Sequence, residues 1–314
     1  MFGLSQSIVV AENQRAFLYR NQQFEQLLKP GKHKVWCGLD EVTHKVFELN
    51  DMYFTEPLAH RMVARHQQIA DQIHDWLIAT NEVGVLYFND RIHRVVAPGE
   101  RFLIWRDVGD VRLERLNINQ NINVDNELLS AMNRRGLNKS SRLLVGKSSD
   151  AIAPVAEVLV AHEQLGLLYV DGEFVKTLSP GKYGFWQLNK KIECRLYDLK
   201  SQTMEISGQE ILTKDRVSLR LNLSANIRLT DVKLAADSVD DVNEYIYKGM
   251  QLALREAVGT KTLDDLLVDK LYINETIKEV VTDDLARVGV TLERVGVKDI
   301  ILPGEMKTIL NQVV

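Results

Sequence analysis

Histidines and paired carboxylates are the residues of this 314-residue chain that could carry metal or acid–base chemistry. His66 and His74 are eight residues apart, so in a helix they would lie near one face, but a zinc site would need a third ligand that cannot be named. Three Asp-Asp pairs fall at expected helix starts or on polar helix faces, where capping and solvation explain them: Asp240-Asp241, Asp264-Asp265 and Asp283-Asp284. We therefore expect no catalytic, cofactor-binding or metal-binding residues.

Sequence motifs for nucleotide binding or hydrolysis give the same answer. The chain contains no P-loop, GxGxxG, GxSxG or HExxH motif. The segment "VGKSS" at 145–149 resembles the end of a phosphate loop but lacks the upstream glycine. Cys37 and Cys194 are far apart in sequence and are interpreted as small apolar residues in a reducing, cytoplasmic compartment. We expect a protein that is not an enzyme and needs no cofactor.

The composition excludes several classes of function. The net charge is −4 and no basic stripe is present, which argues against a nucleic-acid partner. No apolar run approaches the roughly 18 residues needed to span a bilayer. The first residues, "MFGLSQSIVVAENQ", lack the basic region of a signal peptide. Phe2, Leu4 and Ile8 could touch a membrane surface, but the first strand of the fold is the preferred interpretation.

The strongest pattern in the chain is a motif that occurs three times. In each copy a tyrosine precedes a proline by 11 residues, a glycine follows the proline, and a tryptophan closes the unit 6 or 7 residues after it. The matched sets are Tyr19, Pro30, Gly31 and Trp36; Tyr87, Pro98, Gly99 and Trp105; and Tyr169, Pro180, Gly181 and Trp186. A repeat of this kind predicts three copies of one structural module.

Each copy has the pattern of a small antiparallel β-meander. Apolar and polar residues alternate, and the first turns fall at residues that tolerate the left-handed conformation: Asn21-Gln22, Asn89-Asp90 and Asp171-Gly172. The Pro-Gly pair predicts a second turn, of type II, with the glycine at positive φ. We expect the tyrosine and tryptophan to pack in the core of their own unit, and expect a β-branched residue at Gly181 to disrupt folding or assembly.

The segments between the repeats predict helices. Residues 55–79 read as one long helix with Thr55 as N-cap and Pro57 in the first turn. Residues 125–136 read as a shorter helix with Asp125 as N-cap and Gly136 as the stop. The segment 137–157, rich in Ser, Lys and Gly at its start, is expected to be an exposed linker.

The third repeat leads into a different pattern. Two long alternating strands are expected around a turn at Lys214-Asp215, with alternate residues from Val217 to Ile227 on one face. Four helical segments follow, one ending at Gly259 and the next capped by Thr262. A strand precedes a final helix that opens at Pro303.

From about residue 158 to 314 the sequence resembles the stomatin/prohibitin/flotillin (SPFH) superfamily, and within it the stomatin-like slipins. The resemblance is carried by "EQLGLLYVDGEFVKTLSPGKY", "TKDRVSLRLNLSANIRLTD", "LREAVGTKTLDDLL" and "GVTLERVGVKDIILPGEMK". It implies a mixed α/β domain without an active site that self-associates into rings or cages. It also implies that the helix after "ILPGEM" makes coiled-coil contacts.

The expected fold class is α+β, with tandem small antiparallel β modules followed by a mixed α/β SPFH domain and the start of a C-terminal helix. The expected domains are β-module 1 with a helix (1–78), β-module 2 with a short helix (79–136), a linker (137–157), β-module 3 merged into the SPFH domain (158–302), and the C-terminal helix (303–314). The first two modules stand where stomatins carry a membrane anchor. Tandem β-modules before a stomatin-like domain are also similar to the layout of the major vault protein.

These features favour a self-assembling scaffold whose main partner is itself, as a homo-oligomeric ring or vault-like cage of many subunits. The alternative is a slipin-type adaptor, peripheral to the membrane, that organises membrane microdomains or regulates a partner membrane protease. The resemblance supports both interpretations, and the absence of an anchor in the sequence favours the first.

Overall fold

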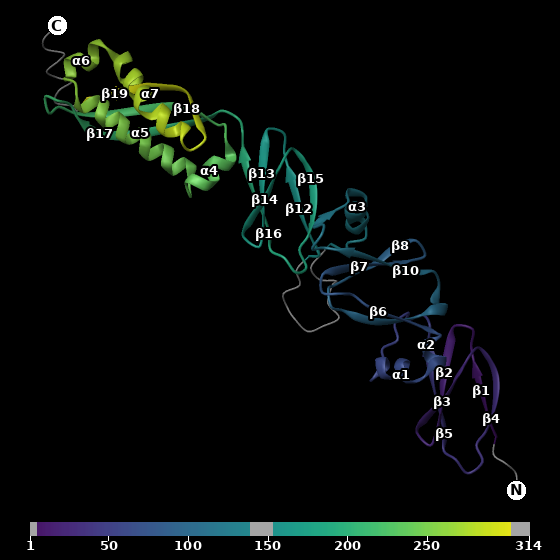
Figure 1. Ribbon diagram of the computed structural model, residues 1–314. Helices are drawn as coiled ribbons and strands as arrows, with labels where there is room; N and C mark the ends of the chain where they lie inside the picture. Colours follow the sequence, from purple (N-terminus) through teal and green to yellow (C-terminus); the bar gives the residue numbers. More distant parts are fainter. Residues whose placement is uncertain (1–4, 139–152, 303–314) are drawn as a thin grey trace. The chain divides into compact units, whose positions relative to one another are not determined.

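The computed structural model describes residues 5–138 and 153–302 (Figure 1). It divides into two compact units. Unit 1 comprises residues 1–157 and 183–191, and unit 2 comprises residues 158–182 and 192–314. The mixed α/β architecture expected from the sequence is confirmed.

Module 1 consists of five strands arranged in two small sheets. The strands are β1 (Ser5–Val10), β2 (Gln14–Arg20), β3 (Gln23–Leu28), β4 (Gly31–Trp36) and β5 (Val42–Glu48). Strands β3, β2 and β5 form one sheet in that order, and β4 leaves it to pair with β1. Apolar side chains from both sheets form a common core: Ile8, Val10, Ala16, Leu18, Leu28 and Val35. The predicted meander is therefore wrong in its order, because β4 crosses to the other sheet.

The other two repeats have the same strand order. Module 2 contains β6 (Ile73–Leu77), β7 (Glu82–Phe88), β8 (Arg91–Val96), β9 (Arg101–Trp105) and β10 (Val111–Asn117). Module 3 contains β12 (Val155–Val160), β13 (Gln164–Val170), β14 (Glu173–Leu178), β15 (Gly181–Trp186) and β16 (Ile192–Asp198). Module 2 has the sheets β8-β7-β10 and β6-β9. Module 3 has the sheets β14-β13-β16 and β12-β15, and the short strand β11 (Asn123–Val124) pairs with the free edge of β15. The repeated sequence motif thus encodes one repeated topology.

The first turn of each repeat is as predicted. Both turn residues have positive φ in all three hairpins: Asn21 and Gln22, Asn89 and Asp90, and Asp171 and Gly172. The Pro-Gly turns differ from the prediction. Gly99, at φ 77°, fits a type II turn, whereas Gly31 (φ 136°) and Gly181 (φ 156°) are already the first residues of extended strands.

The segment 55–79 is not one helix. It forms α1 (Ala59–Arg65), α2 (Gln67–Ala70) and then strand β6, and the N-cap of α1 is Leu58 rather than Thr55. The prediction failed because Ile73–Leu77 pairs with β9, a contact between residues far apart in the chain. After β9, a short 3-10 helix, η1 (Arg106–Val108), leads toward β10.

The helix that follows β10 matches its prediction closely. Helix α3 (Asn126–Arg134) is capped by Asp125, whose carboxylate accepts hydrogen bonds from the N–H groups of Glu127 and Leu128. Gly136 follows at φ 64°. Most of the expected linker, including "VGKSS", lies outside the described residues. Its last residues are not linker, because Val155 begins β12.

The rest of unit 2 is a three-stranded antiparallel sheet covered by helices (Figure 1). The sheet has the order β17 (Gln202–Leu212), β18 (Ser218–Leu229) and β19 (Val290–Ile301). The helices are α4 (Val232–Ser238), α5 (Val242–Gly259), α6 (Leu263–Val268) and α7 (Lys270–Ala286). Alternate residues of β18, among them Leu219, Leu221 and Leu223, are buried against the helices, as the alternation predicted.

Carboxylates near the helix starts act as caps, as the sequence indicated. Asp241 accepts a hydrogen bond from the Glu244 N–H at the start of α5, and Thr262 and Asp265 form a capping box at α6. The helix expected from Pro303 lies outside the described residues, and the proposed domain boundaries remain a prediction.

Candidate functional site: the tryptophan faces of the repeats

The three repeat tryptophans end equivalent strands but differ in burial. Trp105, at the end of β9, is 2% exposed, and Trp186, at the end of β15, is 1% exposed. Trp36, at the end of β4, is 64% exposed. We expected each tryptophan to pack in the core of its own module, and the structure contradicts this for all three: Trp36 is exposed, and Trp105 and Trp186 pack against the preceding module.

Trp105 packs against module 1 rather than into the interior of module 2. Its ring centroid lies 5.1 Å from that of Phe54, 5.7 Å from that of Phe47 and 6.1 Å from that of Phe17. The backbone N–H of Trp105 donates a hydrogen bond to the carbonyl of Met52 at 3.0 Å. The tryptophan is thus the centre of an aromatic cluster that joins the first two modules.

An ion pair stabilises the same junction. Arg15 of β2 is 7% exposed, and its Nη2 lies 2.5 Å from Oδ2 of Asp107 in η1. The Nη1 atom of Arg15 also donates to the carbonyl of Gln14 at 2.6 Å. A buried guanidinium needs such partners, because an unpaired buried charge is costly. The contact ties β2 of module 1 to the residue that follows Trp105 by two positions.

Trp186 is held in the same way within unit 1. Its side chain belongs to a buried cluster that includes Val85, Leu129 and Val155. Its N–H donates to the carbonyl of Ile122 at 2.8 Å. A Cβ added at Gly184, two residues earlier, would lie 3.0 Å from Leu129 Cδ2, so a side chain there would force Leu129 to shift.

The backbone contact of the next residue also repeats. The Arg106 N–H donates to the carbonyl of Gln72 at 2.8 Å, and the Gln187 N–H donates to the carbonyl of Pro154 at 3.0 Å. In each case the acceptor is the residue before the first strand of the module. The two buried tryptophan sites therefore share backbone geometry as well as residue type.

Trp36 lies on the corresponding outer face of the β1–β4 ribbon, but its neighbours there are polar. The register pairs Ser5 with Trp36, Ser7 with Lys34 and Val9 with Lys32. In module 2 the same face pairs Ile73 with Trp105 and Asp75 with Leu103. The positions next to the tryptophan are thus buried and apolar in module 2, where Leu103 is 3% exposed, and polar in module 1.

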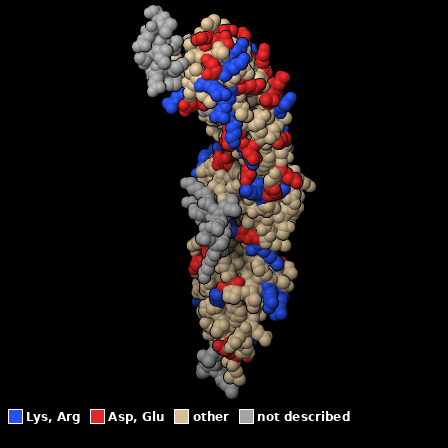
Figure 2. All heavy atoms as spheres, turned by 90° about the vertical axis from the view of Figure 1, so that its left-hand side faces the viewer, with Lys and Arg blue, Asp and Glu red and all other residues tan. Residues whose placement is uncertain are grey.

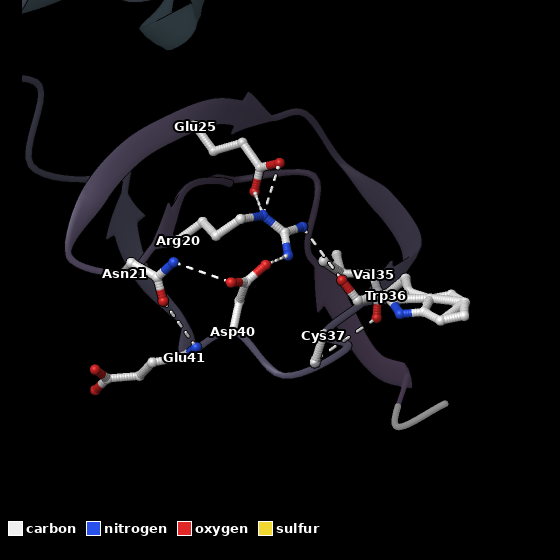
Figure 3. Close-up of polar contacts among 8 residues, drawn as sticks. All are labelled: Arg20, Asn21, Glu25, Val35, Trp36, Cys37, Asp40 and Glu41. Carbon is white, nitrogen blue, oxygen red and sulfur yellow. Dashed lines mark hydrogen bonds and ion pairs between the residues drawn. The ribbon is translucent and has the colours of Figure 1, made fainter. Parts of the chain in front are cut away.

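A polar network fixes the loop that follows Trp36 (Figure 3). Arg20 binds Asp40 through Nη1 at 3.0 Å, binds Glu25 through Nε at 3.1 Å, and donates from Nη2 to the Trp36 carbonyl at 3.2 Å. Hydrogen bonds from Asn21 and Arg20 hold the pKa of the Asp40 carboxyl below its ordinary value. In Figure 3 the Trp36 indole points away from this network.

The repeat tyrosines are partly buried beside the first hairpin of each module. A register shift precedes each of them, between Leu18 and Tyr19 in module 1 and at the matching positions of the other two. Tyr87 donates to Glu114 at 3.1 Å and lies under Arg112, 4.3 Å from the ring centroid. Burial, and then Glu114, raise the pKa of Tyr87. Tyr169 contacts Phe174 edge-on at 5.8 Å.

Sequence reasoning missed a small residue three positions before each tyrosine. These residues are Ala16, Gly84 and Gly166. A Cβ at Gly84 would lie 2.8 Å from Ile78 Cδ1, and one at Gly166 would lie 3.0 Å from Cys194 Sγ. Extending the alignment of the three repeats upstream would have found this signal. The aromatic residues at 17, 47 and 54 are not repeated and gave none.

His66 and His74, the two histidines considered for a metal site, lie in different kinds of element. His66 lies between α1 and α2, and His74 lies in β6, so they do not share a helix face. No group of three or more His, Cys, Asp or Glu side chains able to hold a metal occurs within 5–138 and 153–302. In those same ranges no helix is both long and apolar enough to cross a bilayer. On the face drawn in Figure 2, acidic and basic side chains are interspersed over the upper part of the molecule.

Comparison with known proteins identifies the second half of the chain. The profile of the SPFH domain / Band 7 family matches residues 158–314, which is half of the sequence. The chain belongs to the SPFH domain / Band 7 family. The resemblance seen in the sequence motifs is thereby confirmed.

Several relatives are similar to parts of the SPFH protein. An uncharacterized protein of Methanocaldococcus jannaschii is 28% identical over 173 residues, which is 54% of this chain and 84% of the relative. A stomatin homolog of Pyrococcus horikoshii is 26% identical over 152 residues, covering 48% of this chain and 55% of the relative. Human stomatin-like protein 3 is 30% identical over 110 residues, covering 35% and 38%. The chain therefore spans little more than half of the Pyrococcus relative and less of the human one.

Proposed function

We propose that this SPFH protein is a non-enzymatic scaffold that assembles with copies of itself into a large ring or cage. The observation that carries the proposal is the combination of an SPFH domain with repeated β-modules, which provide structure and no recognisable chemistry. Family membership supports self-association in general, and the closed ring or vault-like cage is our more specific claim.

Exposed apolar side chains on the helices of unit 2 support self-association. Along one side of α5, Tyr245 is 37% exposed and Leu252 is 66% exposed, and a Cβ at Gly249 between them would meet no atom within 4 Å. Val268, the last residue of α6, is 89% exposed, and Leu271 at the start of α7 is 68% exposed. Contiguous exposed apolar groups mark surfaces that bind other proteins, and the side of α5 with Tyr245 and Leu252 is the candidate surface.

The three-stranded sheet of unit 2 gives a second argument. Its order leaves β17 and β19 as edge strands, of 11 and 12 residues. Long edges offer unpaired backbone groups to another chain and are a liability unless they are covered. Closed rotational symmetry among many copies would cover such surfaces without leaving free ends.

Electron microscopy and mass photometry of the purified chain test the proposal. We expect a discrete particle of many subunits at micromolar concentration, and we expect Leu252→Glu to shift it toward smaller species. The matched control is Leu77→Glu, because Leu77 is 55% exposed but lies in β6 of unit 1. A monodisperse monomer at ten micromolar would refute the assembly.

A second candidate function is a membrane-peripheral adaptor of the slipin type, which organises membrane microdomains or regulates a membrane protease. The similarity to proteins named as stomatin homologs favours it. Co-purification with a membrane protease from the native host would support this function, whereas assembly into particles that never contact membrane would contradict it.

A further inference from the structure

The outer face of the β1–β4 ribbon presents exposed apolar and basic side chains together. Trp36 is 64% exposed and Val9 is 68% exposed, and Leu39, in the loop after β4, is fully exposed at 107%. Lys32 and Lys34 lie on the same ribbon face between Val9 and Trp36 and are exposed. The equivalent faces of the other two repeats carry a buried tryptophan instead.

The apolar groups of this face do not form a pocket. The Val9–Lys32 pair is four register positions from the Ser5–Trp36 pair, which is about 14 Å at roughly 3.4 Å per residue. Leu39 follows Gly38, which has φ 57° and whose backbone approaches the Trp36 indole: a Cβ there would lie 3.1 Å from Nε1. Separate side chains projecting from one ribbon face can each enter a lipid headgroup layer.

The charges near the face are mostly positive once the ion pairs are counted. Lys32 and Lys34 face serine or valine across the ribbon. Asp40 and Glu25 share the guanidinium of Arg20, so this network keeps one net negative charge next to the two lysines. On the face itself the two lysines are the charged side chains, so it presents positive charge beside exposed aromatic and aliphatic groups.

Three arguments speak against a second copy of this chain as the occupant. Symmetric pairing of two such faces would bring Lys32 and Lys34 of both copies together, and like charges repel. The receptors that cover Trp105 and Trp186 are already filled by those residues within unit 1. A ribbon of two six-residue strands also offers only about 200 Å², well below the roughly 800 Å² per partner of a stable protein interface.

We propose that this face, formed by Val9, Lys32, Lys34, Trp36 and Leu39, binds the surface of a membrane that contains anionic lipids. Tryptophan is favoured at the membrane–water interface, and each lysine near an anionic surface adds attraction. The inference goes beyond the assembly proposal, since a single chain or a ring could bind in this way. Many copies in one ring would strengthen a weak contact through avidity.

Flotation of the full chain with vesicles tests the inference. The probes are vesicles of phosphatidylcholine alone and vesicles with 30% phosphatidylserine. We expect binding to the second kind only, and a loss of at least about tenfold in partitioning for Lys32→Glu/Lys34→Glu. We expect a similar loss for Trp36→Ser/Leu39→Ser.

Matched variants in unit 2 control for charge and for apolar content. Lys248→Glu/Lys278→Glu changes the net charge equally, and Leu159→Ser removes an apolar side chain that is 70% exposed. Both should bind vesicles as the unmodified chain does, when compared at equal oligomer size by mass photometry.

The outcomes separate this inference from the assembly proposal. Failure of the unmodified chain to float with anionic vesicles overturns the inference, and so does equal loss in the ribbon and control variants. If Trp36→Ser/Leu39→Ser instead lowers particle size in solution without any lipid effect, the occupant is protein and the inference is wrong. A monomer that still floats with anionic vesicles would refute assembly and support the lipid face.

Discussion

Replacement of Trp105 by alanine should open the junction between modules 1 and 2. The indole is 2% exposed and contacts three phenylalanine rings with centroid distances of 5.1 to 6.1 Å. Removing a buried tryptophan side chain costs about 3–5 kcal/mol, because the transfer free energy is lost and a cavity remains. At about 1.4 kcal/mol per factor of ten, the equilibrium constant for opening should rise at least about 100-fold.

Trp36→Ala is the matched control, because Trp36 occupies the same repeat position and is 64% exposed. A surface substitution of this kind should change stability by about 0.5 kcal/mol or less. Hydrogen–deuterium exchange measured on peptides from β2 and β9 reports opening of this junction separately from unfolding of unit 2.

The comparison of the two variants decides whether burial against the preceding module matters. Faster exchange in β2 and β9 for Trp105→Ala alone supports the reasoning. Equal exchange rates in the two variants would refute it, since the same chemical change would then have the same effect in both environments. Trp186→Ala should behave like Trp105→Ala, with the effect centred on α3 and β7.

Three further predictions concern single contacts. Asp107→Asn should lower the free energy of unfolding by about 1–3 kcal/mol, and with it the unfolding temperature, because the buried Arg15 loses its carboxylate partner. Asp40→Asn, at an exposed ion pair, should lower the unfolding temperature less in the same thermal scan. Gly289→Ala should be strongly destabilising, because its Cβ would lie 2.2 Å from the Asp231 carbonyl oxygen at φ 70°, whereas Gly249→Ala in α5 should stabilise by up to about 1 kcal/mol in urea unfolding. A hydrogen bond from Arg101 holds the pKa of Asp75 below its ordinary value, so the ionised carboxylate stabilises the folded state. This stabilisation is fully present above the pKa of Asp75 in the unfolded chain and is lost as pH falls through its pKa in the folded chain. The difference in unfolding temperature between the unmodified chain and Asp75→Asn should therefore shrink below about pH 4.

Local signals in the sequence were enough to predict much of the fold. The hairpin turns at 21–22, 89–90 and 171–172, the cap at Asp125 and the alternation along β18 all depend on a few adjacent residues. The motifs of the second half were specific enough to name its family. Each of these features is determined by chemistry within one strand, one turn or one helix end.

Features that depend on distant partners were not predicted. The residues of β6 have apolar positions compatible with either a helix or a strand, and pairing with β9 decides between them. The pairing of β4 with β1, in a separate sheet from β3, likewise joins residues far apart in the chain, and periodicity does not contain that information. The burial of Trp105 and Trp186 against the preceding module, and the exposure of Trp36, could not be predicted from the sequence for the same reason.

The role of each repeat tryptophan depends on its neighbours across the ribbon. In β9 the flanking Leu103 and the paired Ile73 are apolar, so the whole face gains by leaving water, and Trp105 is buried with it. In β4 the corresponding neighbours are Lys34 and Ser5. Removing these polar groups from water would cost more free energy than burying the indole would provide. A partner for Trp36 must therefore accept an indole and leave two ammonium groups solvated or matched with negative charge. A hydrocarbon core or an apolar protein core would accept the indole but would leave the lysine ammonium groups without water or negative charge. An anionic lipid interface satisfies both conditions.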